Sequence, residues 1–181
     1  MSLAGIVLCG GKSRRMGVDK AGLIFNGQTW LEVAANTLTA AGAAHILYSG
    51  RPDLPGGLGD PVADSGPAGG VLAALMQVGV DVEQVLCVPV DMPELSPDTL
   101  RLLAAHKGVG AYFEGEPLPF ALRLSPAVLT AARQCVTTAA RAPSLRALLR
   151  QVGCVEIPVP PGLNLRNLNT PQDVAALKPR A

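Results

Sequence analysis

Basic residues follow the first apolar segment of the chain with a spacing that suits phosphate groups. Residues 8–20 read LCGGKSRRMGVDK and come directly after the apolar stretch LAGIV. Adjacent glycines let a backbone approach a ligand closely, and lysine and arginine side chains balance the charge of phosphoryl oxygens. The pattern indicates a loop that binds a polyphosphate through the backbone at Gly10 and Gly11 and through the side chains of Lys12, Arg14, Arg15 and Lys20. A solvated basic turn without a ligand is the alternative interpretation.

The common phosphate-binding fingerprints do not fit this loop. A Walker A motif would need a glycine at the position of Ile6, and the residues just before Gly10 form an apolar strand and not a flexible turn. The dinucleotide fingerprint G-x-G-x-x-G also fails, because the next glycine after Gly11 is Gly17. The loop therefore belongs to another class of nucleotide or phosphate site.

Two aspartates follow other apolar segments, in VPVDMP (residues 88–93) and ADSGPAGG (63–70). Ligands of α/β folds bind outside the carboxyl ends of the strands, so we expect Asp91 to share a crevice with the glycine loop. Because Mg²⁺ binds one or two carboxylates together with substrate phosphates, Asp91 is the candidate metal ligand. Asp64 could hydrogen-bond a base or a ribose. Either aspartate could instead serve only in a turn.

The elements that would position these residues alternate between strand and helix, which predicts an α/β fold with a mostly parallel sheet covered on both faces. The predicted strands are 3–9, 45–49, 61–63, 84–90, 111–113, 119–124 and 155–159. The predicted helices are 29–41, 68–78, 97–106, 126–136, 144–152 and one that begins at Pro171. Ser96 and Thr170 are placed to cap two of these helices. At 181 residues the chain is expected to form a single domain, 1–181.

Composition excludes several classes of function. The net charge of +1 leaves no chain-wide basic field, so nucleic acid is not an expected partner. No apolar stretch approaches the roughly 18 to 20 residues that span a bilayer, so no membrane association is expected. The four cysteines contain no C-x-x-C pair, which argues against a zinc site. Free thiols within apolar segments favour a reducing compartment, and we expect a cytoplasmic protein.

Four segments together resemble the molybdenum cofactor guanylyltransferases, a family of Rossmann-like nucleotidyltransferases. The segments are VLCGGKSRRMGVDK, DSGPAGG, PVDMP and NLNTPQD, and they extend over residues 7–173. The first and third also resemble related enzymes that use sugar nucleotides or CTP, whereas the last favours the molybdenum branch. The resemblance implies a three-layer fold of the nucleotide-diphospho-sugar transferase type.

The resemblance also implies a reaction, in which the terminal phosphate of molybdopterin attacks the α-phosphate of GTP and pyrophosphate leaves. Asp91 would hold Mg²⁺, and Lys20 and Arg14 would stabilise the leaving pyrophosphate. Asp64 would accept a hydrogen bond from guanine or ribose. The backbone contacts to the nucleotide would come from Leu8, Cys9, Gly10 and Gly11.

Residues on the acceptor side follow from the same resemblance. Asn167 and Asn169 would orient the metal or the molybdopterin, and Pro119, Phe120 and Arg123 would line the pterin side. Proteins that deliver the cofactor or accept the product are further expected partners.

This chain departs from the family pattern at two points. Cys9 replaces the usual alanine, and Ser65 alone separates Asp64 from the glycine–proline step. The alternatives are a nucleotidyltransferase that uses CTP or another phosphorylated acceptor, and a non-catalytic nucleotide- or cofactor-binding adaptor. A pure binding protein would not need both Lys20 and Asp91, which argues against the adaptor.

Overall fold

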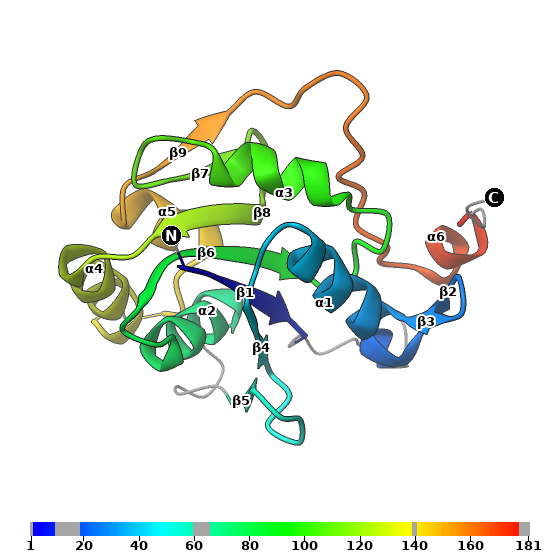
Figure 1. The fold of residues 1–181 in the computed structure, drawn as a ribbon, viewed down its shortest axis with the longest axis horizontal. Helices are drawn as coiled ribbons and strands as arrows, with labels where there is room; N and C mark the ends of the chain where they lie inside the picture. The colour runs from blue at the N-terminus through cyan, green and yellow to red at the C-terminus, as the bar shows by residue number, and fades with distance from the viewer. Residues whose placement is uncertain (1, 10–18, 60–65, 139–140, 178–181) are drawn as a thin grey trace.

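The computed structural model describes residues 2–9, 19–59, 66–138 and 141–177, and contains one large sheet. Its order is β5-β4-β1-β6-β8-β7-β9 (Figure 1). These seven strands are β1 (Ser2–Leu8), β4 (His45–Ser49), β5 (Gly57–Leu58), β6 (Val82–Pro89), β7 (Gly110–Phe113), β8 (Glu116–Arg123) and β9 (Cys154–Ile157). A separate small hairpin joins β2 (Ile24–Phe25) to β3 (Gln28–Thr29).

Helices cover both faces of the sheet. They are α1 (Trp30–Ala40), α2 (Gly66–Gln77), α3 (Pro97–Ala104), α4 (Pro126–Thr137), α5 (Leu145–Gln151) and α6 (Pro171–Ala175). The apolar residues of α1 and α3 pack in one core and those of α2, α4 and α5 in the other, on the opposite side of the sheet (Figure 1). This confirms the predicted three-layer α/β class. Within the described residues, no helix has the length and apolar character required to cross a membrane.

The central strands supply side chains to both cores. Ile6 of β1 packs with the α2 side and Val7 with the α1 side, and both are fully buried. Successive side chains of a strand point to opposite faces, so a strand covered on both sides must be apolar throughout. The continuous apolar segments of the sequence follow from this arrangement.

One strand runs against the others. β8 pairs antiparallel with both β6 and β7, with Gln84 opposite Arg123, whereas β1 pairs parallel with β4 and β6. A short turn between β7 and β8 allows this, since antiparallel strands need no crossover. The carboxyl end of β8 therefore lies at the opposite edge of the sheet from the carboxyl ends of β1 and β6.

The C-terminal segment returns to the carboxyl ends of the central strands. In Figure 1 the orange-to-red chain leaves β9 and descends to α6, beside the β2–β3 hairpin. The Leu168 side chain is fully buried, and its N–H donates to the carbonyl oxygen of Asp91 at 2.9 Å. The Asn164 amide also donates to Glu94 at 3.1 Å. We refer to residues 163–173 as the C-terminal strap.

One predicted strand differs from the structure at its end, and another lies outside the described residues. The last predicted strand, 155–159, is β9 and ends at Ile157, where the following prolines cannot donate to a ladder. The predicted strand 61–63 lies outside the described residues, and the strand next to β4 is the earlier β5.

Candidate active site

Lys20, Asp91 and Asn169 meet at the carboxyl edge of the sheet. The Lys20 ammonium donates to Asp91 Oδ2 and to Asn169 Oδ1, both at 2.8 Å. The Lys20 and Asp91 side chains are 13% and 18% exposed, so the pair is reached by solvent only from one side. The site therefore combines a cation, a carboxylate and an amide oxygen that come from three distant parts of the chain.

A short turn presents Lys20. It begins the 3-10 helix η1 (Lys20–Gly22), for which Asp19 is the N-cap and accepts from the Ala21 N–H at 3.0 Å. The Ala21 side chain is buried, which fixes the turn against the α1 core. Arg51, just after β4, reaches across to Asp19 Oδ2 at 3.2 Å and also pairs with Asp53. Arg51 thus braces the turn that carries Lys20.

Asp91 is positioned by the central strands. It follows β6 by two residues, and the Val90 N–H donates to the Leu8 carbonyl at 3.1 Å, so the ends of β1 and β6 remain tied. On the other side, the Leu168 N–H holds the carbonyl of Asp91 itself. The hydrogen bonds with Leu8 and with Leu168 together fix the backbone that carries the Asp91 carboxylate.

Asp173 organises the part of the strap that carries Asn169. Its Oδ2 accepts from the Asn169 N–H at 3.0 Å, and from the N–H and hydroxyl of Thr170 at 2.8 Å each. Its Oδ1 accepts from Arg166 at 2.8 Å. The Arg166 guanidinium, followed by the Thr170 and backbone donors, holds the pKa of Asp173 well below its usual range. Asp173 therefore remains charged at all physiological pH values.

Leu8 and Cys9, which lead into the glycine loop, form backbone hydrogen bonds with residues at the ends of the neighbouring strands. The Leu8 carbonyl accepts from Val90, and the Cys9 N–H donates to the Ser49 carbonyl at 2.9 Å. Because an amide has one hydrogen to donate, a backbone contact of Cys9 with a nucleotide would involve its carbonyl group. Burial raises the pKa of the Cys9 thiol to about 12, against a smaller opposing effect of the Arg51 charge.

Comparison with known proteins identifies the family to which this site belongs. The model of the MobA-like NTP transferase domain matches residues 5–156. The molybdenum cofactor guanylyltransferase of Xanthomonas euvesicatoria is 39% identical over 176 residues, which cover 96% of this chain and 93% of that protein. The chain belongs to the MobA-like NTP transferases. It is an enzyme, which removes the non-catalytic adaptor from consideration.

Solved structures show that this MobA-like transferase has the fold of the nucleotide-diphospho-sugar transferases. The molybdopterin-guanine dinucleotide biosynthesis protein A of Archaeoglobus fulgidus superposes with a TM-score of 0.70 at 19% identity, over 95% of each chain. The Rv0371C protein of Mycobacterium tuberculosis, solved as a complex with manganese, gives a TM-score of 0.65 at 19% identity over 96% of each chain.

Several candidate residues of this transferase either make no hydrogen bond to Lys20, Asp91 or Asn169 among the described residues or lie outside them. Asn167 is half-buried in the strap, two residues before Asn169. Pro119 is buried and Phe120 lies in the core on the α2 side, so neither presents a free surface to a pterin. Residues Gly10, Gly11, Arg14 and Asp64 lie outside the described residues.

Arg123 was expected on the acceptor side, and the structure corrects this. Arg123 ends the antiparallel β8 and pairs with Gln84, seven residues before Asp91, or about 23 Å along an extended strand. Its guanidinium donates to the His106 carbonyl at 3.4 Å, at the amino ends of β1 and β6. The resemblance alone suggested the acceptor side, whereas the antiparallel direction of β8 places Arg123 at the opposite edge of the sheet from Asp91.

The oxygen donors of the site suit a hard divalent cation. Asp91 Oδ2 and Asn169 Oδ1 converge on the same ammonium, and carboxylate and amide oxygens are ligands of Mg²⁺. Mg²⁺ is usually bound by one or two carboxylates together with substrate phosphates and water. The residues present therefore fit the metal that the family implies.

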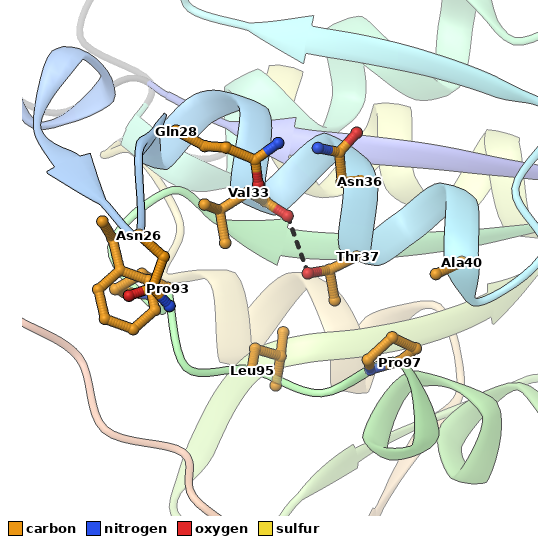
Figure 2. Close-up of a pocket in the computed structure, with 10 residues that line it drawn as sticks. Asn26, Gln28, Val33, Asn36, Thr37, Ala40, Pro93, Leu95 and Pro97 are labelled. Atoms are coloured by element: carbon orange, nitrogen blue, oxygen red, sulfur yellow. Dashed lines mark hydrogen bonds between the residues drawn. The ribbon is translucent and has the colours of Figure 1, made fainter. Parts of the chain in front are cut away.

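One pocket of the described residues is not lined by Lys20 or Asp91. This pocket of about 260 Å³ lies between the β2–β3 hairpin, α1 and residues 93–97 (Figure 2). Its polar lining includes Asn26, Gln28, Asn36 and Thr37, and the Thr37 hydroxyl donates to the Val33 carbonyl at 2.8 Å. This pocket could not be predicted from the sequence, because its walls come from separate segments.

Proposed function

We propose that this protein transfers GMP from GTP to molybdopterin, which forms the guanine dinucleotide cofactor and releases pyrophosphate. The observation that carries the proposal is the convergence of Lys20, Asp91 and Asn169, one residue from each of three family segments. The choice of GTP and molybdopterin is supported by the names of curated relatives, such as the 39% identical guanylyltransferase.

In this reaction the acceptor phosphate oxygen forms a bond to the α-phosphorus of GTP, and the bond from that phosphorus to the bridging oxygen of the β-phosphate breaks. The protein contributes mainly position and charge. Lys20 would donate to the oxygens of the departing pyrophosphate, where negative charge grows in the transition state. Asn169 would hold the ammonium at the correct place, because its Oδ1 accepts from Lys20 directly.

A divalent cation, which we propose to be Mg²⁺, would be held by Asp91, with Asn169 as a second oxygen donor. When bound, it would neutralise charge on the phosphates of GTP. The manganese complex of a structural relative supports a divalent metal in this fold. Arg14, Asp64 and the glycines Gly10 and Gly11 keep their proposed roles in nucleotide binding.

We further propose that residues 1–181 act as one catalytic domain. The C-terminal strap supports this, because Asn169 completes a site whose other residues come from the first half of the chain. A cytoplasmic location is supported by the four free thiols at Cys9, Cys87, Cys135 and Cys154.

The test is pyrophosphate release and dinucleotide formation with GTP, CTP, ATP or UTP, each with and without molybdopterin and Mg²⁺. Product should form only with GTP, molybdopterin and metal together. Asp91→Asn should remove the activity, whereas Asp98→Asn, at a carboxylate that is 86% exposed on α3, should keep it. Equal turnover of CTP would assign the protein to the cytidylyl alternative, and turnover without molybdopterin would show a different acceptor.

A further inference from the structure

Asp173 lies outside the Lys20–Asp91–Asn169 site and contacts neither Lys20 nor Asp91 in any hydrogen bond of the described residues. It nevertheless accepts four hydrogen bonds, and one of them comes from the backbone of Asn169. A capping box needs only the bonds to Thr170. The additional bond to Asn169 and the ion pair with Arg166 need another explanation.

We propose that Asp173 is a positioning residue for guanylyl transfer, which acts by fixing Asn169 so that its amide oxygen holds the Lys20 ammonium. This inference rests on the proposed function of Asn169. One carboxylate oxygen of Asp173, Oδ2, accepts hydrogen bonds from the N–H groups of Asn169 and Thr170. These N–H groups belong to the peptide units on either side of the Asn169 Cα, so the backbone of Asn169 is held in one orientation. The Asn169 side chain leaves that backbone and reaches Lys20 at 2.8 Å.

The strap leaves few other constraints on Asn169. Asn169 itself is exposed, whereas Leu168 before it is fully buried and bonded to the Asp91 carbonyl. Leu168 thus fixes the strap on one side of Asn169 and Asp173 fixes it on the other. Without Asp173, the anchor at Leu168 would remain while the Asn169 peptide could rotate.

A carboxylate is required at this position, and an amide would not replace it. The two oxygens of Asp173 face four donors and must accept from all of them. An asparagine would direct its NH₂ group either at the backbone N–H groups or at Arg166, and in both orientations donors would face donors. Arg166 keeps Oδ1 occupied, so Oδ2 remains directed at the backbone.

The chain offers a matched control in the capping box of α1. There Glu32 accepts from the N–H and hydroxyl of Thr29 at 2.7 and 2.8 Å, the same chemistry at a helix start. It has no bond to a residue of the site among the hydrogen bonds of the described residues. Glu32→Gln therefore removes the charge of a capping box, as Asp173→Asn does, without loosening Asn169.

The experiment compares Asp173→Asn, Asn169→Ala, the double variant and Glu32→Gln by steady-state kinetics with GTP, molybdopterin and Mg²⁺. Asp173→Asn should lower kcat about tenfold with KM for GTP within about twofold, since a contact used in the transition state is weakened. The double variant should be no slower than Asn169→Ala, because residues that act through one another are not additive. Glu32→Gln should keep kcat, because Glu32 has no bond to a residue of the site among the described residues.

A readout independent of turnover is the side-chain amide signal of Asn169 in a ¹H–¹⁵N spectrum. It should shift in Asp173→Asn and stay in place in Glu32→Gln. Additive kcat losses, an unchanged kcat or an unmoved Asn169 signal in Asp173→Asn would each overturn the proposal. A wild-type protein without guanylyl transfer would instead refute the proposed function, and the spectra would still decide whether Asp173 positions Asn169.

Discussion

Replacing Lys20 with methionine should strengthen the binding of Mn²⁺ to the nucleotide-free protein while it slows turnover. Methionine keeps the unbranched stem but lacks the ammonium that lies 2.8 Å from Asp91 Oδ2. A cation that binds this oxygen in the wild type must displace the ammonium. In Lys20→Met the carboxylate has lost this competitor, so the metal binds without that cost.

The exposure of the pair sets the size of the effect. With side chains 13% and 18% exposed, the Lys20–Asp91 pair lies between surface pairs, worth about 0.2–1 kcal/mol, and buried pairs, which cost about 3–5 kcal/mol to break. Displacing the Lys20 ammonium from Asp91 should therefore cost Mn²⁺ about 1–2 kcal/mol of binding free energy in the wild type. Without this cost, the Kd for Mn²⁺ should be about 5–30-fold lower in Lys20→Met.

The measurement is a titration of free Mn²⁺ by electron paramagnetic resonance in the absence of nucleotide. Lys107→Met, at an exposed lysine after α3, is the matched control and should leave the Kd unchanged. Adding Asp91→Asn to Lys20→Met should abolish the gain. Unchanged or weaker Mn²⁺ binding in Lys20→Met would refute the idea that Lys20 competes with metal for Asp91.

Three further outcomes follow from the same structure. Asp91→Asn should lower kcat by at least about 10²-fold, while the melting temperature changes by less than about 5 °C; retained activity would remove Asp91 from the mechanism. Leu168→Ala should cost about 2–5 kcal/mol in urea unfolding because the side chain is fully buried, whereas Leu102→Ala, at a 44% exposed side chain, should stay within about 0.5 kcal/mol. The free energy of unfolding should fall as the pH rises from 9 towards 12. Burial raises the pKa of the Cys9 and Cys154 thiols from 9.0 to about 12, so the unfolded chain loses these protons at a lower pH than the folded protein. A free energy of unfolding that stays constant over this range would contradict the prediction.

The helices and the central strands could be predicted because their signals are local. Ser96 and Thr170 accept from backbone N–H groups at the starts of α3 and α6, as their positions before proline indicate. The fully apolar segments that became β1 and β6 also follow directly from burial on both faces. The direction of β8 could not be predicted in this way, because an apolar segment has the same pattern whichever way it runs.

The site was only partly accessible from the sequence. Apolar segments followed by Asp91 and by the glycine loop indicated a common edge of the sheet, whereas the position of Asn169 followed from the family resemblance alone. The brace from Arg51 to Asp19 gave no signal, since an exposed ion pair between residues 32 positions apart leaves no periodic pattern. Asp173 appeared only as the last residue of the segment NLNTPQD, and its bond to Asn169 could be found only from the structure.

If Asn169 acts as proposed, the C-terminal strap also sets the point in its own synthesis at which the enzyme can become active. Lys20 and Asn169 are 149 positions apart, and Asn169 leaves the ribosome after every strand of the sheet has been made. A nascent chain can therefore build the sheet and bring Asp91 beside the first strand while the Lys20 ammonium still lacks its amide partner. Under the proposed function, the order of translation delays chemistry until the strap is in place, and a cut between β9 and Leu168 would remove both the amide partner of Lys20 and a buried core residue.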